Sequence, residues 1–494
     1  MAASSAPFPA RVPIPAADQT WLHMDRPNNL MHVHSLMWLE REPDWADLQA
    51  VLRDRVLDRF PVFRRRATLV DGHWMWEDYD AFDIARHIHR LELPEPRDVA
   101  TLQAYISRRF SAPFPDDLPL WDMTVLPDVV GFDDEPRTVV FSRFHHALAD
   151  GIRLVQLLLS MCDALETDVL PPHVGRDGHG LLESGTAAVR RGVADAVDVA
   201  KGLAAGAMAI PRAVVHLAPT AFEQGLDLLV HPHKILDAME SVGSLHNQSV
   251  NTVSEVTRLL AAGRSAHTSW SGTPGVDKAV AWVTGLDLGG VREVGREHGA
   301  TVNDVLLAVI SRALSRYLAE REALVEEIHW LVPVSLQPLD SNLPEALGNH
   351  FSLVFLPMPL GIDDPADLIG AVHARMTRLK ESAEPVVSFG LQWLVAESPA
   401  AVSVRLTNLF ANKAVGVLTN VPGPKSAMTF AGVPVSGVMG WAPTSGDQPL
   451  SLAIFSYHGK VNLCIAADAR LIPDANAIAD LISEEFDALV GDRD

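Results

Sequence analysis

The stretch TVVFSRFHHALADGIRLVQLLL, residues 138–159, decides how the rest of the chain is interpreted. It begins with the β-branched and aromatic residues typical of a strand and ends in an apolar run with the spacing of a helix. His145 and His146 lie where the strand gives way to the helix, and Asp150 and Gly151 follow. A strand-to-helix junction exposes side chains at the end of a sheet, so a functional role is expected here.

This junction has four interpretations. Asp150 could cap the helix while Gly151 eases the turn, with the histidines in the core. His146 and Asp150 are four residues apart, as in some metal sites, but no third ligand has helical spacing and no HExxH pattern occurs. A histidine–aspartate dyad needs a serine nucleophile, and the nearest approach to GxSxG, residues 263–267, lies in a loose linker. The fourth is a lone histidine acting as general base on a substrate hydroxyl.

Composition narrows the class of protein. The chain has 494 residues, which predicts two domains, with 48% hydrophobic and 21% charged residues. Forty basic and 62 acidic residues give a net charge of −22, which argues against a nucleic-acid partner. Cys162 and Cys464 are isolated in apolar runs, so we expect buried reduced thiols rather than a metal site.

No targeting or spanning segment is expected. The N-terminal residues contain four prolines among the first 19 and no continuous apolar core, unlike a signal peptide. No run of ~18 apolar residues occurs, the length that a membrane helix needs. We therefore expect a cytoplasmic protein.

The pattern divides the chain into three parts. Residues 1–180 alternate strands with helices, including a strand over 31–40 and amphipathic helices over 45–60 and 99–114. Residues 181–275 hold an amphipathic helix over Val189–Ala207 and a linker.

Residues 276–494 form the third part. One strongly periodic helix over 299–321 lies among apolar segments that read as strands. These segments are AVAWVTGLDL, IHWLVPVSL, FSLVFLPMPL, AVGVLTNVPG, LSLAIFSYHG and VNLCIAADAR. Both ends of the chain therefore predict an α/β fold.

These residues permit a comparison with a known family. The HHxxxDG pattern after a strand resembles the signature of the chloramphenicol-acetyltransferase-like acyltransferases. PLWDM at 119–123, TVNDVLL at 301–307 and NVPGP at 420–424 resemble motifs of the bacterial wax ester synthase/diacylglycerol acyltransferase family. ADQTWLHMDRPNNLMHVHSL at 17–36 matches the start of that family's pattern, so the resemblance covers nearly the whole chain.

The resemblance implies two similar α/β halves, each a mixed sheet with helices, and a tunnel between them. His146 matches the catalytic base and His145 the less indispensable first histidine, with Gly151 completing the signature. Asp150 is implied to turn away from the tunnel into an ion pair with an arginine. The implied reaction transfers a long-chain acyl group from acyl-CoA, as a substrate, to diacylglycerol or a long-chain alcohol, without a metal or other cofactor.

The remaining motifs have two interpretations each. Thr301 and Asp304 fit a capping-box variant, so Asn303 and Asp304 either mark a helix start or line the tunnel. Trp121 either fills the core or, with its neighbours, contacts substrate. The predicted substrate-binding residues are Pro119, Leu120, Trp121, Asn303, Asp304, Asn420 and Gly423. His32 and His34 share one face of a strand and are treated as ordinary.

Two stretches depart from the family's pattern. Arg143 stands where the family usually has a lysine-like residue, and SGTPGVDKAVAW at 271–282 replaces an inter-domain segment that often carries two arginines. The contacts of that segment therefore cannot be carried over from the family.

Long-chain substrates partition into lipid, so we expect peripheral association with the inner face of the membrane or with lipid inclusions. The Val189–Ala207 helix, with Arg190 and Arg191 beside an apolar stripe, could contact lipid or pack on the core. Two other functions compete with the acyl-CoA reaction: a condensation domain acting on carrier-bound acyl groups, and a non-catalytic lipid-binding protein. The intact HHALADG weighs against the second.

Overall fold

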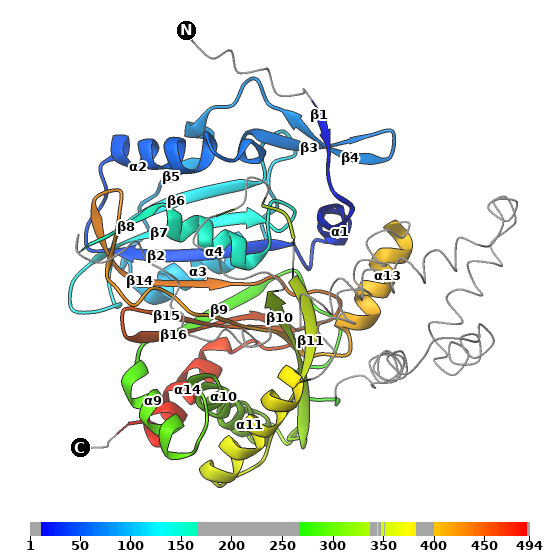
Figure 1. Cartoon of the computed structure of the whole chain (residues 1–494), viewed down its shortest axis with the longest axis vertical. Helices are drawn as coiled ribbons and strands as arrows, with labels where there is room; N and C mark the ends of the chain where they lie inside the picture. Colours follow the sequence, from blue (N-terminus) through cyan, green and yellow to red (C-terminus); the bar gives the residue numbers. More distant parts are fainter. Residues whose placement is uncertain are drawn as a thin grey trace, which may run out of the picture.

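The computed structural model describes residues 11–165, 266–335, 343, 347–349, 351–381 and 400–491 (Figure 1). Within these ranges the strands form a seven-stranded, a six-stranded and a three-stranded sheet. The two large sheets lie one above the other in Figure 1, each with its own helices. The segment predicted to form the Val189–Ala207 helix lies outside the described residues.

The first large sheet has the strand order β5-β6-β7-β2-β14-β13-β8. Its strands are β5 (Ile88–Arg90), β6 (Trp121–Val129), β7 (Arg137–His145), β2 (His32–Leu39), β14 (Val433–Trp441), β13 (Met428–Phe430) and β8 (Cys162–Ala164). The helices of this part of the chain are α1 (Ala16–Met24), α2 (Trp45–Leu52), α3 (Val99–Phe110) and α4 (Gly151–Ser160). Two of its strands, β13 and β14, come from the C-terminal part of the chain, which the sequence did not predict.

The second large sheet has the order β11-β10-β12-β15-β16-β9. Its strands are β11 (Phe351–Pro359), β10 (Glu327–Ser335), β12 (Gly416–Val421), β15 (Leu450–Tyr457), β16 (Lys460–Asp468) and β9 (Lys278–Asp287). The helices are α9 (Leu288–Glu297), α10 (Val302–Ala319), α11 (Pro365–Glu381), α13 (Ala400–Ala411) and α14 (Ala475–Leu489). Four of them, α9, α10, α11 and α14, lie together below this sheet in Figure 1.

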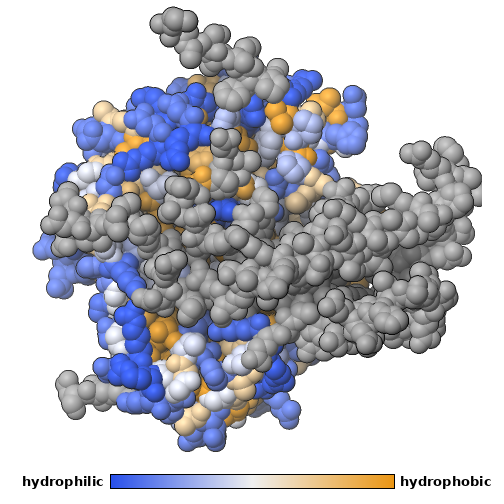
Figure 2. All heavy atoms as spheres, in the orientation of Figure 1, coloured by the Kyte–Doolittle hydropathy of each residue, from blue (hydrophilic) through white to orange (hydrophobic). Residues whose placement is uncertain are grey.

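A small sheet of β1 (Arg11–Pro13), β4 (His73–Asp78) and β3 (Arg65–Val70) lies at the N-terminal end of the molecule (Figure 1). Shorter helical turns are Arg53–Leu57, Pro61–Arg64 and Ile84–Arg86. In the view of Figure 2, hydrophilic residues cover most of the described surface. None of the helices described is both long enough and apolar enough to cross a bilayer.

Strand β2 is buried on both faces, although its first half contains the polar residues His32, His34 and Ser35. Val33 and Met37 pack into the core that includes α2 and α4, whereas Leu36 and Trp38 face a second core. That second core contains residues of both large sheets, Phe141 from β7 and Phe455 from β15 among them, so the halves share buried apolar surface.

The predicted secondary structure is confirmed for the strands at 31–40 and 138–145, for the helix of residues 302–319, and for the C-terminal strands. The helix predicted over 45–60 ends as an α-helix at Leu52 and continues as a π-helical turn to Leu57. Cys162 and Cys464 are buried free thiols, as expected, and burial raises the pKa of each to about 12.

Candidate active site

The two histidines lie at the end of a central strand. β7 pairs with β2 on one side and β6 on the other, with His145 opposite His32. The backbone N–H of His146 donates to the Met31 carbonyl at 2.8 Å, and that of His145 to the Leu120 carbonyl at 2.9 Å. The strand therefore ends with both histidine peptides anchored to neighbouring strands.

The helix that follows begins with a side-chain cap. Asp150 is the N-cap of α4, and its Oδ1 accepts a hydrogen bond from the backbone N–H of Arg153 at 2.8 Å. Asp150 is buried and also belongs to the lining of the cavity described below. Capping is confirmed; the ion pair with an arginine implied for Asp150 stays a prediction.

Gly151 is the first residue of α4. A Cβ built at this position meets no atom within 4 Å, and Gly151 lines the cavity. The turn therefore has no steric need for glycine, and a side chain at this position would extend into open space.

His146 is buried between aromatic side chains. Its ring stacks on Trp21 with a centroid distance of 3.8 Å, and Phe351 lies at 5.7 Å. Burial lowers the pKa of His146 to about 3, so the imidazole is neutral at physiological pH. Its Nδ1 has no hydrogen-bond partner among the described residues, so no described carboxylate orients the ring through that atom. This geometry is that of a lone neutral base rather than a histidine–aspartate dyad.

His145 has a different environment. Its Nδ1 accepts a hydrogen bond from the Ala147 backbone N–H at 3.0 Å, so the ring proton is on Nε2, which lies 3.1 Å from Asp25 Oδ2. Asp25 in turn accepts from the Met31 backbone N–H at 2.6 Å. His145 thus ties the turn to the segment before β2 and is not placed to act as a base.

His146 faces a large apolar cavity between the halves. The empty volume is about 1280 Å³, a figure that includes space open to solvent. The N-terminal part supplies residues of α1, β2 and α4, and the C-terminal part residues of β10, β11, β12, β14 and β15. The apolar lining includes Leu154, Leu158, Leu159, Leu331, Leu353, Val417, Val421, Met439, Trp441 and Phe455. Such walls suit an alkyl chain, since each buried CH₂ is worth about 0.8 kcal/mol.

Comparisons with known proteins agree with this arrangement. Residues 14–306 match the model of the wax ester synthase/diacylglycerol acyltransferase catalytic domain, and residues 347–490 match the C-terminal domain model of that family. The chain belongs to this family. A putative diacylglycerol O-acyltransferase of Mycobacterium tuberculosis is 26% identical over 96% of this chain and 89% of its own. The O-acyltransferase WSD of Acinetobacter baylyi is 23% identical over 97% of both chains.

Solved structures share the fold. The wax ester synthase/diacylglycerol acyltransferase from Marinobacter aquaeolei VT8 superposes with a TM-score of 0.63 and 17% identity, covering 97% of this chain and 98% of its own. The first condensation domain of the calcium-dependent antibiotic synthetase has a TM-score of 0.58 and 13% identity, covering 98% and 96%. The expected fold of two α/β halves is therefore confirmed.

Most of the other residues predicted to bind substrate do not line the described cavity. Trp121 is buried, stacks on His87 at 4.6 Å and donates from Nε1 to the Phe63 carbonyl at 2.8 Å. Pro119 and Leu120, like Trp121, do not belong to the cavity lining as far as the described residues show it. The core interpretation of Trp121 accounts for these contacts, and the substrate-binding role of the three residues gains no support.

The start of α10 is closed by neighbouring side chains. Thr301 and Asp304 form the predicted capping box. Asp304 Oδ2 also lies 2.8 Å from His373 Nδ1, and Asn303 Oδ1 accepts from Asn420 Nδ2 at 2.9 Å. None of Asn303, Asp304 and Asn420 belongs to the lining of the described cavity, so the helix-start interpretation accounts for this geometry.

Gly423 is the predicted substrate-binding residue that does line the cavity. A Cβ at this position would lie 1.8 Å from the Ser456 carbonyl oxygen. Glycine is therefore required for the close approach of the two chains, which is a packing reason for its presence.

The departure at Arg143 has a structural explanation. Arg143 is fully buried and pairs with Asp122 through two of its nitrogens, Nε at 2.9 Å. Its Nη1 donates to the Ala112 carbonyl at 2.6 Å, and Arg109 also contacts Asp122 at 2.7 Å. The hydrogen bonds of the guanidinium are thus made to Asp122 and to main-chain carbonyls, so Arg143 has a structural role.

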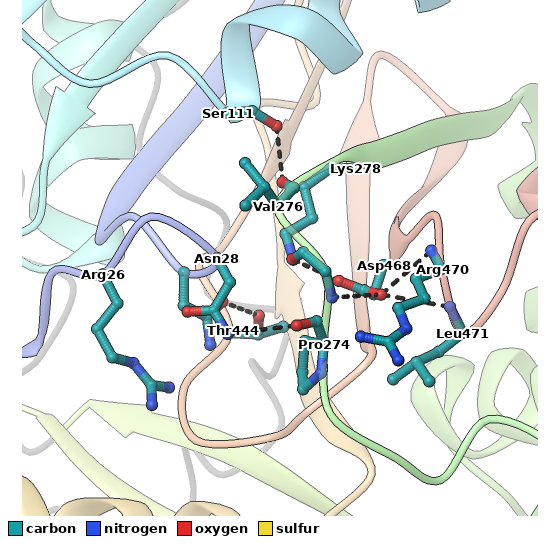
Figure 3. Close-up of polar contacts among 12 residues, drawn as sticks. Arg26, Asn28, Ser111, Pro274, Val276, Lys278, Thr444, Asp468, Arg470 and Leu471 are labelled. Atoms are coloured by element: carbon teal, nitrogen blue, oxygen red, sulfur yellow. Dashed lines mark hydrogen bonds and ion pairs between the residues drawn. The ribbon is translucent and has the colours of Figure 1, made fainter.

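In the second departure, the inter-half segment, main-chain carbonyls accept hydrogen bonds from residues of the N-terminal half (Figure 3). Asn28 Nδ2 donates to the Pro274 carbonyl at 3.4 Å, and Ser111 Oγ to the Val276 carbonyl at 2.9 Å. Lys278 forms an ion pair with Asp468 at 2.7 Å. Residues 274–278 therefore contact both halves beside the seam.

Four residues of the site were missed by the sequence reasoning: Asp18, Trp21, Asn349 and Phe351. Asp18 and Trp21 lie three residues apart in the family-like N-terminal stretch, which was a usable signal. Asn349 and Phe351 reach His146 only through the contact between the halves, and no local pattern indicates that.

Proposed function

We propose that this member of the acyltransferase family moves a long-chain acyl group from acyl-CoA to the hydroxyl of diacylglycerol or a long-chain alcohol, giving triacylglycerol or a wax ester. The observation that carries the proposal is a neutral His146 facing an apolar cavity that both family domains line.

The reaction needs one base. His146 removes the proton from the alcohol as its oxygen attacks the thioester carbon, and the resulting imidazolium protonates the thiolate when the C–S bond breaks. A base of this kind typically contributes ~10²–10⁴ in rate. The low pKa of His146 keeps the ring unprotonated before the substrates bind, and the imidazolium forms only beside the developing oxyanion, so opposite charges appear together.

No metal, nucleotide cofactor or covalent acyl-enzyme enters this scheme. The atoms balance with acyl-CoA and alcohol as substrates and ester and free CoA as products. The cavity supplies orientation, which can lower the barrier as much as the base does.

We also propose that the protein binds lipid surfaces peripherally, because the ester product and the alcohol substrate partition into lipid. Liposome flotation tests this: wild-type protein should float, and the Val193→Asp/Val197→Asp variant should not. Undiminished binding of that variant would place the contact elsewhere.

The function is tested with purified protein, radiolabelled palmitoyl-CoA and either hexadecanol or diacylglycerol. We expect labelled wax ester or triacylglycerol with stoichiometric release of CoA. Formation of neither product, together with transfer from a carrier-bound acyl group, would show a condensation activity instead.

A further inference from the structure

The peptide of His146 is held from both halves of the molecule. Its N–H donates to the Met31 carbonyl at 2.8 Å, and its carbonyl accepts a hydrogen bond from Asn349 Nδ2 at 2.9 Å. The next residue back, Gly348, accepts from the backbone N–H of Asp150 at 3.2 Å. Residues 348–349, from the C-terminal family domain, therefore supply two hydrogen bonds to the turn that carries the base.

Asn349 is itself anchored by Asp18. Asp18 Oδ1 accepts from the Asn349 backbone N–H at 3.1 Å and from Nδ2 at 2.7 Å. Asp18 and Trp21 are three residues apart on α1, which places them on one face of the helix. A single helix therefore provides both the ring that stacks on His146 and the carboxylate that anchors Asn349.

Burial of the Asp18 carboxylate has a free-energy cost. It is 4% exposed, and burial raises its pKa to about 6, with the charge of Asp150 acting in the same direction. The hydrogen bonds from Asn349 act in the opposite direction, because they favour the ionised carboxylate. An apolar residue would avoid this desolvation cost, so the carboxylate calls for a reason beyond packing.

We propose that Asp18 and Asn349 are positioning residues for His146: Asp18 orients the Asn349 amide, and that amide fixes the carbonyl of the catalytic turn across the contact between the halves. The inference rests on the function proposed above, since it concerns the geometry of the base in that reaction. It makes turnover depend on a contact between the two domains that neither domain can supply alone.

A swap of the two side chains separates this role from simple stability. Asn349→Asp removes the donor to the His146 carbonyl and brings two carboxylates together. Asp18→Asn/Asn349→Asp restores a donor and acceptor pair between the two positions, but residue 349 still has no side-chain donor for His146. We expect Asn349→Asp to have a lower melting temperature than the wild type and a kcat at least tenfold lower. The double variant should regain the wild-type melting temperature but not the wild-type kcat.

The chain offers a matched control. Gln103 of α3 donates to Asn476 of α14 at 3.1 Å, another contact between the two family domains, exposed and not part of the described cavity lining. Asn476→Asp should leave kcat within about twofold of the wild type. In all variants KM for acyl-CoA should change less than threefold, because the substrate-binding walls are untouched, and kcat is normalised to the folded fraction.

Selective ¹⁵N-histidine labelling gives a readout that does not need the reaction. The His146 ring signals, assigned by their loss in His146→Ala, should shift in Asn349→Asp and in the double variant but not in Asn476→Asp. Wild-type kcat in Asn349→Asp, recovery of kcat in the double variant, or unshifted ring signals would each overturn the inference. An inactive wild-type protein would instead contradict the proposed function, and the ring signals would still decide the positioning role.

Discussion

The turn after β7 and the start of α10 both contain an aspartate that caps a helix N-terminus, but the two helix starts have different surroundings. In both, an aspartate accepts a hydrogen bond from a backbone N–H: Asp150 from Arg153 at 2.8 Å and Asp304 from Thr301 at 2.9 Å. In both, polar side chains precede or begin the helix: His145 and His146 in the first, and Thr301 and Asn303 in the second. The first turn opens into the cavity, whereas the second is covered by His373 and Asn420.

The difference shows what a motif can and cannot indicate. An acidic residue at a helix N-terminus is explained by capping and the helix dipole wherever it occurs. Whether the neighbouring side chain meets a substrate depends on the position of the junction relative to the seam between the halves. His146 lies at that seam, and Trp21 and Phe351 reach it from distant parts of the chain.

The strongest way to break the comparison is to disturb the packing of Gly423, a residue that lines the cavity. Gly423→Ala places a Cβ 1.8 Å from the Ser456 carbonyl oxygen, so the backbones must separate. We expect a loss of about 3 kcal/mol or more, seen as loss of soluble folded protein. Gly151→Ala is the control, because its Cβ meets no atom within 4 Å; a Gly423→Ala variant as stable as that control would contradict the packing account.

A second prediction concerns acid stability. The folded-state pKa of His146 is about 3 against 6.5 for the exposed side chain, so at pH 5 the unfolded chain binds a proton at this position and the folded protein does not. Stability due to this group is complete above pH 6.5 and is lost as the pH falls below it, by about 2 kcal/mol at pH 5.

Urea unfolding at pH 7.5 and pH 5.0 measures this effect. The wild type should lose about 2 kcal/mol more than His146→Asn between these values. His32, His34 and His87 also have lowered pKa values, but they contribute equally to both proteins. Equal losses in the two proteins would show that His146 is not buried as a neutral ring.

A third prediction separates the adjacent histidines. His145→Ala removes the contacts to Asp25 and to the Ala147 backbone, which should loosen the turn and lower kcat about tenfold, equivalent to about 1.4 kcal/mol. Asp25→Asn, which weakens the same contact from its other end, should lower kcat by no more than this. A loss in His145→Ala that exceeds the loss in His146→Ala would reverse the two roles.

The smallest effect is expected at the start of α10. Asp304→Ala breaks the capping box and should cost about 1 kcal/mol of stability while leaving kcat per folded molecule within threefold. Thr301→Ala, the other half of the same box, should behave alike. A large fall in kcat without a change in melting temperature would instead place Asp304 in the reaction and make the two junctions equivalent.

The sequence predicted the strands, the long α10 helix and the position of the two histidines because periodicity and the strand-to-helix junction are local properties. It left open whether Asn303 and Trp121 met the tunnel, since core packing and substrate contact use the same residue types. The contribution of β13 and β14 to the first sheet, and of Asn349 to the catalytic turn, arises from pairing between distant segments, which no local pattern encodes.

The most direct test of the account is the kcat for ester formation by His146→Ala, measured with palmitoyl-CoA and hexadecanol or diacylglycerol and normalised to the folded fraction. We expect a fall of about 10²–10⁴ with an unchanged fold, because the neutral imidazole that stacks on Trp21 at the cavity is removed. A variant that retained more than about a tenth of wild-type turnover would contradict the assignment of His146 as the general base.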